Sequence, residues 1–145
     1  MKTIVYIAML LVSFVSLASP SPLTKVDECL LAGRAVHLEG KIGSETFPGR
    51  PNYDSIKDGD EPETYWIFTS DQSFCGLGYH YATKKLYRIE GRSKRFQLLL
   101  KKGCCNNVKN LLDKKVILKG QMFVGNNGHH HTKMLIEVTN IEPAL

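Results

Sequence analysis

The segment that decides the fold is residues 115–141, K-V-I-L-K-G-Q-M-F-V-G-N-N-G-H-H-H-T-K-M-L-I-E-V-T-N-I. Two apolar, β-branched runs flank a short Gly/Asn segment that ends in three consecutive histidines. Gly and Asn tolerate the positive φ that tight turns require, so the segment is typical of a β-hairpin. The pattern predicts strands over 116–124 and 131–141.

Upstream of this hairpin, three further strand regions are predicted. Residues 34–42 alternate, with Val36, Leu38, Gly40 and Ile42 on one face, and Gly40 inside this half-buried strand suggests a bulge or sharp bend. Aromatic and β-branched residues predict a second strand over 65–70. The third region consists of strand pieces over 86–89 and 96–100, and the run G-L-G-Y-H-Y after Cys75 is expected to be a turn or irregular link.

The order of these elements predicts an all-β fold. A long loop over 44–64 joins the first two strands, because its prolines and glycines exclude a regular element. A short helix over 108–114, with Asn106 or Asn107 as N-cap, separates the third strand from the closing hairpin. This order is the one expected of a five-stranded OB-fold-like barrel with one short helix between strands 3 and 4; an unspecified small barrel is the alternative.

The chain start predicts export. A basic Met1-Lys2, a short apolar run and Ser16-Leu17-Ala18 describe a signal peptide over 1–18, removed after Ala18. A single domain over 19–145 remains, with no predicted membrane span, and its net charge falls from +5 to +4 with the loss of Lys2. We therefore expect a periplasmic or secreted protein.

Four cysteines would enter that oxidising compartment, and they allow three pairings. A Cys104–Cys105 bridge would join adjacent Cα atoms, about 3.8 Å apart, whereas a disulfide usually needs about 4.4 Å or more. The favoured pair is Cys29–Cys75, which closes a loop of about 45 residues worth roughly 4 kcal/mol. Cys104 and Cys105 are left as free, bridged to each other, or bonded to a partner.

The candidate binding site is a rim formed by residues 47–66 and 125–132. In OB-folds the loop between the first two strands and the loop between the last two frame the ligand face. These two loops are also the most unusual stretches of this chain. The predicted ligand-binding residues are Phe47, Asn52, Tyr53, Asp60, Glu61, Trp66, His129, His130, His131 and Thr132.

Metal binding is a second interpretation of the same rim. If a strand begins at the histidines, His129 and His131 point to one face at i and i+2 and could chelate zinc or another divalent metal, although a tight site needs a third protein ligand. The plainer interpretation is a hydrogen-bonded turn. The neighbouring acids Asp54, Asp58, Asp60, Glu61 and Glu63 do not have EF-hand spacing, which favours a turn through Asp58-Gly59-Asp60 over calcium binding.

A basic stretch over 84–102 carries eight bases and one acid, Glu90. Its members Lys84, Lys85, Arg88, Arg92, Lys94 and Arg95 could attract an acidic partner, an envelope polymer or a membrane surface. Export argues against nucleic acid. No recognisable arrangement of catalytic residues appears, so no catalytic residue is assigned.

The loop F-P-G-R-P-N-Y-D-S-I-K-D-G-D-E-P-E-T-Y-W and the turn G-H-H-H-T resemble a family of small exported bacterial proteins, the domain of unknown function 4431. The resemblance spans residues 29–141, and it implies that both loops and the cysteines Cys29 and Cys75 are family features. The basic stretch and Cys104-Cys105 depart from the family pattern. The family brings no settled activity.

Together these features predict an exported, non-enzymatic binding protein, of the inhibitor or immunity type or an envelope accessory protein, that uses the rim. One alternative is a metal-binding protein or metal-dependent enzyme centred on His129 and His131. Another is a structural role, in which the two loops pack on each other to close the barrel and the basic strand pair is the working surface.

Overall fold

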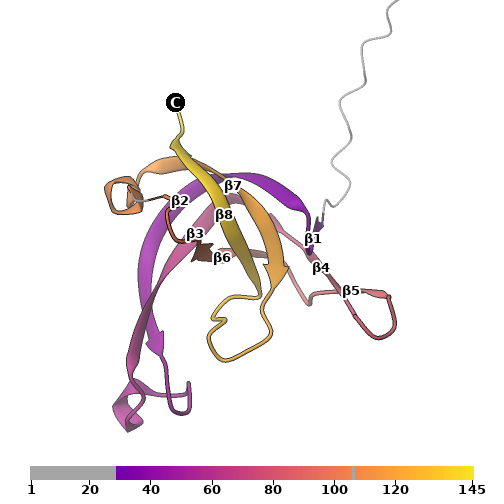
Figure 1. The fold of residues 1–145 in the computed structure, drawn as a ribbon, viewed down its shortest axis with the longest axis vertical. Coiled ribbons are helices and arrows are strands. Elements are labelled where there is room, and N and C mark those ends of the chain that lie inside the picture. The colour runs from indigo at the N-terminus through magenta and orange to yellow at the C-terminus, as the bar shows by residue number, and fades with distance from the viewer. Residues whose placement is uncertain (1–28, 106) are drawn as a thin grey trace, which may run out of the picture.

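The computed structural model describes residues 29–105 and 107–145, so the predicted signal peptide and its cleavage after Ala18 lie outside the described residues. Five strands form a closed barrel in the order β2-β3-β6-β8-β7 (Figure 1). Their bounds are β2 Ala35–Pro48, β3 Pro62–Phe74, β6 Ser93–Leu100, β7 Lys115–Val124 and β8 Met134–Pro143. Only β6 and β8 pair in parallel; the other barrel pairs are antiparallel. The predicted all-β class and five-stranded barrel are confirmed.

Alternation along the strands fills the barrel as expected. Val36, Leu38 and Ile42 of β2 are buried, as the period-2 pattern predicts. Gly40 lies on the same face, and the pairing of β2 has no register shift there, so of the predicted bulge or sharp bend the bulge is wrong. A Cβ at Gly40 would lie 2.2 Å from the carbonyl oxygen of Thr69, which shows that glycine is needed for a close approach to β3.

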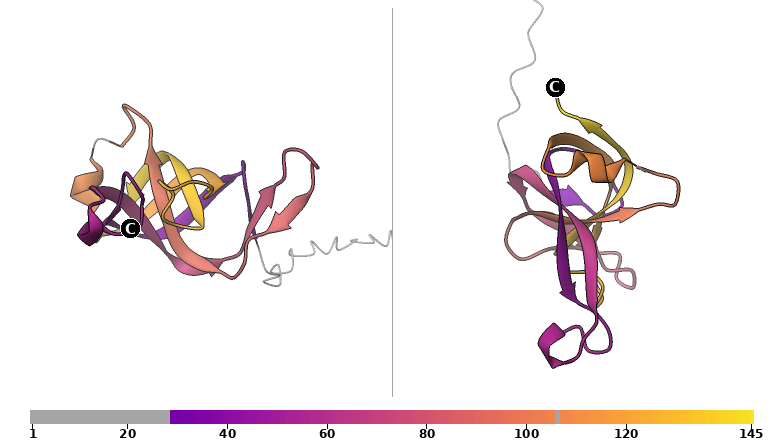
Figure 2. Two further views of the ribbon diagram at one scale, coloured as in Figure 1. Left: turned by 90° about the horizontal axis from the view of Figure 1, so that it is seen from below. Right: turned by 90° about the vertical axis from the view of Figure 1, so that its left-hand side faces the viewer.

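The predicted long loop over 44–64 is too long. Residues 44–48 continue β2 and pair with residues 62–66 of β3, and the hydroxyls of Thr46 and Thr64 are 2.8 Å apart across the two strands. The true connection is residues 49–61, which contain one 3₁₀ turn, Ile56–Asp58. The paired ends of β2 and β3 form an arm that extends beyond the barrel and holds this connection at its tip (Figures 1 and 2). Alternation in the arm is interrupted by Pro48 and Pro62, which hid it from the sequence pattern.

A second projection lies between β3 and β6. The chain after Cys75 forms β4, Gly76–Tyr79, which pairs with β5, Leu86–Arg88, and with β1, Leu30–Leu31, in a three-stranded sheet. The predicted irregular link after Cys75 is therefore wrong. Gly78 has no side chain because the ring of Tyr87 occupies that space, 2.2 Å from where a Cβ would be.

The predicted disulfide is confirmed, and a second one is present. Cys29 and Cys75 are bonded with a Cα separation of 4.5 Å, and Cys104 is bonded to Cys105. The predicted helix over 108–114 is a single 3₁₀ turn, Val108–Leu111. Of the two predicted N-caps, Asn107 makes no side-chain capping bond, and Asn106 lies outside the described residues. None of the helices in the described residues is long and apolar enough to cross a membrane.

Candidate functional site

One carboxylate organises the tip of the β2–β3 arm. Asp60 is buried and accepts hydrogen bonds from the backbone N–H groups of Asn52, Asp54 and Ser55 at 2.7 to 2.9 Å. These bonds, the one from Asp54 above all, hold the pKa of Asp60 below its usual value, while burial opposes the shift. The predicted turn over Asp58-Gly59-Asp60 is present, with Gly59 at φ +108°. Its last residue, Asp60, holds the connection between β2 and β3 together through these hydrogen bonds.

The connection between β7 and β8, residues 125–133, contains the three histidines and is called the histidine loop here. It folds back over the outer face of the barrel, where it contacts Gln97 of β6. β8 begins at Met134, so the prediction that a strand starts at His131 is wrong. The amide of Gln97, from β6, donates to the carbonyl of His129 and accepts from the N–H of His131, both at 2.8 Å. Thr132 accepts from the N–H of Gln97 and donates to the carbonyl of Met134. These bonds satisfy the loop backbone in place of a strand partner.

The two loops are joined by a chain of side-chain hydrogen bonds. The hydroxyl of Tyr53, at the arm tip, is 2.8 Å from Nε2 of His129, whose Nδ1 is 3.3 Å from Oε2 of Glu63. Tyr65 donates to the same Oε2 at 2.5 Å. The consistent assignment is that Tyr53 donates to Nε2 of His129 and that Nδ1–H of His129 donates to an ionised Glu63.

The pKa shifts of Glu63 and Tyr65 agree with this assignment of the hydrogen bonds. The bond from Tyr65 and the neighbouring His129 lower the pKa of Glu63, against an opposing effect of burial. Burial, followed by the bond to Glu63, raises the pKa of Tyr65 to about 12. At neutral pH Glu63 is therefore an acceptor and Tyr65 a donor, so this part of the contact persists without a change of charge.

His131 completes the contact by stacking. Its ring lies flat against Phe47, with centroids 4.2 Å apart and planes 6° from parallel, and it also meets Tyr65 at 5.1 Å. Its Nε2 is buried without a hydrogen-bond partner, and burial lowers its pKa. A neutral imidazole fits this apolar stack. His130 points elsewhere: its Nδ1 accepts from the N–H of Asn126, and burial lowers its pKa too.

The structure therefore brings together Phe47, Tyr53, His129 and His131, with Thr132 beside them, as one contact between the loops. The other predicted site residues lie apart from it. Asn52 contributes its backbone N–H to Asp60, and Glu61 is exposed. Trp66 is partly buried and packs against the barrel core.

The chemistry that this contact can perform is limited. Within the described parts of the chain, 29–105 and 107–145, no group of three His, Cys, Asp or Glu residues could hold a metal ion. Both ring nitrogens of His129 already have protein partners. An imidazole oriented by a carboxylate can act as a general base, but Tyr53 and His129 line neither of two hollows in the described residues, of which one lies beside the histidine loop and the other away from it. One of these hollows, about 360 Å³, is lined by residues 125–127 and 130–133; the other, about 490 Å³, lies between β2 and the end of β3.

Three residues of the contact were not among the predicted binding residues: Glu63, Tyr65 and Gln97. Gln97 is a single polar residue within the apolar run F-Q-L-L-L, and a buried polar side chain of this kind must find hydrogen-bond partners. That signal was present in the sequence, but nothing in it identified the partners, which are 32 and 34 residues away. Tyr65 carried no signal beyond its strand propensity.

The six residues of the basic stretch that were predicted to meet a partner divide into two groups. Arg92 donates to Oγ and the carbonyl of Ser73, Lys94 donates to the carbonyl of Asp71, and Arg95 pairs with Glu45, so these three bind the barrel itself. The other three, Lys84, Lys85 and Arg88, lie on the β4–β5 hairpin and its tip. Among the described residues, no acid forms an ion pair with any of these three.

Comparison with known proteins supports the family resemblance for the C-terminal part. Residues 95–142 match the family described as Domain of unknown function (DUF4431). This segment includes the histidine loop and Gln97 but not the β2–β3 arm. No curated protein and no solved structure matches the chain significantly.

Proposed function

We propose that this protein is an exported, non-enzymatic binding protein that recognises a partner protein through the rim formed by residues 47–66 and 125–132. An inhibitor or immunity-type protein, or an envelope accessory protein, is the class this describes. The observation that carries the proposal is the direct side-chain contact between the two loops, from Tyr53 to His129 and from Phe47 to His131. Loops that are already ordered bind without the cost of ordering them.

The surface offered to a partner is the outer side of this contact. Ile56 is 44% exposed at the arm tip, and Arg50, Pro51 and Lys57 around it are exposed as well. An apolar residue surrounded by charged ones has the composition of a small protein-binding surface. The face of β3 and β6 that OB-type barrels use for ligands is covered here by the histidine loop, which favours a partner that contacts the loops from outside.

Site-specific photo-crosslinking tests the proposal. A photoreactive residue at position 56 is expected to form a covalent adduct with one envelope protein, whereas the same residue at position 37, an exposed site on the barrel wall, forms none. Tyr53→Ala, which loosens the arm tip from His129, should reduce the adduct while leaving the melting temperature of the barrel nearly unchanged. Equal adducts at both positions, or an adduct unaffected by Tyr53→Ala, would refute the use of this rim.

Export is tested separately. N-terminal sequencing of the protein recovered from the cell envelope or medium should begin at Ser19 if the signal peptide over 1–18 is removed as proposed. Recovery of an uncleaved chain from the cytosol would refute it without bearing on the rim.

A further inference from the structure

The β4–β5 hairpin carries a surface that the rim does not explain. Among the described residues, five large apolar side chains are notably exposed, and three of them belong to this hairpin: Tyr81 at 87%, Leu86 at 52% and Tyr79 at 47%. Tyr79 and Leu86 are directly opposite each other in the strand pair, so they share one face of the hairpin. Tyr81 lies in the turn at the hairpin tip.

The opposite face of the hairpin is already occupied. The ring of Tyr87 covers Gly78 and meets His80 at 4.5 Å, and a Cβ at Gly76 would touch Ile89 and Met134. The apolar face of Tyr79 and Leu86 is thus the one turned away from the protein. Figures 1 and 2 show the hairpin projecting from the barrel in a direction different from the β2–β3 arm.

Basic residues surround this apolar face. Residues 76–88 contain Lys84, Lys85 and Arg88 and no acid. Arg88 pairs with Leu77 in the register, so it lies on the same face as Tyr79 and Leu86, at the end nearer the barrel. A protruding apolar tip flanked only by positive charge is complementary to a surface that is negatively charged outside and apolar beneath.

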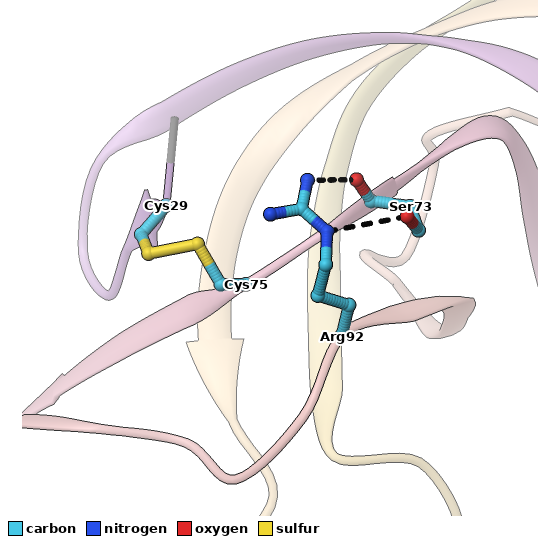
Figure 3. Close-up of a disulfide and its surroundings, with 4 residues drawn as sticks. All are labelled: Cys29, Ser73, Cys75 and Arg92. Atoms are coloured by element: carbon cyan, nitrogen blue, oxygen red, sulfur yellow. Dashed lines mark hydrogen bonds between the residues drawn. A yellow bond between two sulfur atoms is a disulfide. The ribbon is translucent and has the colours of Figure 1, made fainter. Parts of the chain in front are cut away.

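The base of the hairpin is held firmly. The disulfide Cys29–Cys75 fixes the start of the segment that leaves β3 and returns to β6. Arg92 fixes the end of this segment by donating to Oγ of Ser73 at 3.2 Å and to the carbonyl of Ser73 at 2.6 Å (Figure 3). Phe74 and Ser93, the residues just outside Cys75 and Arg92, are paired with each other. The hairpin is therefore closed at its root, and its exposed face keeps a defined direction relative to the barrel.

We propose that the β4–β5 hairpin docks the protein onto an anionic phospholipid surface, with Tyr79, Tyr81 and Leu86 entering the headgroup region and Lys84, Lys85 and Arg88 contacting lipid phosphates. Tyrosine suits this depth because its ring is apolar and its hydroxyl stays hydrated. A convex hairpin contacts a flat surface with its tip and flanks at once. The docking surface is separate from the rim, so it does not depend on the proposed function.

Vesicle binding tests this proposal, using the chain from Ser19 onward with its disulfides intact. The protein is expected to bind vesicles of phosphatidylglycerol and phosphatidylcholine and not vesicles of phosphatidylcholine alone. Lys84→Gln/Lys85→Gln should weaken binding by roughly 25-fold, about fivefold for each basic residue near the surface. The control Lys109→Gln/Lys114→Gln removes the same charge from exposed positions in the β6–β7 connection and should change binding less than twofold.

The apolar contribution has its own pair of variants. Tyr81→Ser/Leu86→Ser should weaken binding at least tenfold, whereas Ile56→Ser on the arm should not. The tryptophan of Tyr81→Trp should shift its emission to the blue and be quenched by brominated phosphatidylglycerol, and that of Ile56→Trp should do neither.

Three results would overturn the proposal: equal binding to both kinds of vesicle, binding unaffected by the hairpin variants, or quenching at position 56 in place of 81. Binding to a soluble polyanion that needs Lys84 and Lys85 but not Tyr81 and Leu86 would also overturn it, because it would identify an acidic polymer or protein as the partner.

Discussion

Replacement of Gln97 by methionine is expected to release the histidine loop from the barrel. Gln97 is 1% exposed, and its amide makes two hydrogen bonds to the loop, from Nε2 to the carbonyl of His129 and to Oε1 from the N–H of His131. A neutral hydrogen bond contributes about 1 kcal/mol net, and each buried partner left unsatisfied costs about 1 to 3 kcal/mol. The loop can rehydrate in part, so we expect Gln97→Met to lower the free energy of unfolding by about 3 kcal/mol.

Urea denaturation and amide hydrogen exchange measure this effect. The midpoint should fall, and the N–H of His131 should lose its protection while the amides of β2 and β7 keep theirs. Gln97→Glu separates the two bonds, because an ionised carboxylate can still accept from His131 but cannot donate to His129. It should therefore be destabilised at neutral pH and recover as the pH falls and the carboxyl is protonated.

Gln121→Met is the matched control. Gln121 is on β7, partly exposed, and its side chain makes one bond, from Nε2 to the carbonyl of Gly33. Its replacement should cost about 0.5 kcal/mol or less, as is usual for a position at the surface. The reasoning is refuted if Gln97→Met costs no more than this control, or if His131 stays protected in it.

Three further outcomes are expected. Gly40→Ala should destabilise the barrel by about 3 kcal/mol in the same denaturation assay, because the new Cβ would overlap the carbonyl oxygen of Thr69. Gly43→Ala is the control and should be nearly neutral, because no atom lies within 4 Å of the new Cβ. Burial holds the pKa of His131 below 6.5, so the unfolded chain binds the proton more readily and stability is lost as the pH falls through 6.5. His131→Phe should reduce this loss in urea midpoints measured at a series of pH values. An unchanged dependence of the midpoint on pH would contradict the stacked, neutral ring. Reduction of Cys29–Cys75, or its replacement by serines, should lower stability by roughly 4 kcal/mol for a separation of 46 residues, and a melting temperature unaffected by the change would contradict this.

The barrel was predictable because its signal is local. Alternation in β2 and the apolar runs of β7 and β8 identify strands without reference to other parts of the chain, and their inward residues, such as Val36 and Leu38, are buried as expected. The β2–β3 arm and β4 were missed because their sequences contain Pro48, Pro62, Gly76 and Gly78, which usually break strands. Their pairing with neighbouring segments outweighs that local preference.

The rim was predictable only in outline. Reasoning from the strand order placed two loops near each other, but the partners of His129 and His131 depend on side chains from different strands. Glu63 looked like one of five similar acids, and only the arm geometry distinguishes it from its neighbours. The start of β8 was misplaced because the histidine loop takes its hydrogen bonds from Gln97, which no local pattern of the loop reveals.

The contact between the arm and the histidine loop has a consequence for engineering. Gly128 has no room for a side chain, since a Cβ there would lie 2.9 Å from the ring of Tyr53. At Gly49 the side chain of Glu63 likewise occupies the space where a Cβ would lie. A loop transplanted alone onto another barrel would lose the surface against which it is shaped. The two loops should therefore be grafted or randomised as one cassette, with positions 53, 63, 128 and 129 held together and the diversity placed at 50, 51, 56 and 57.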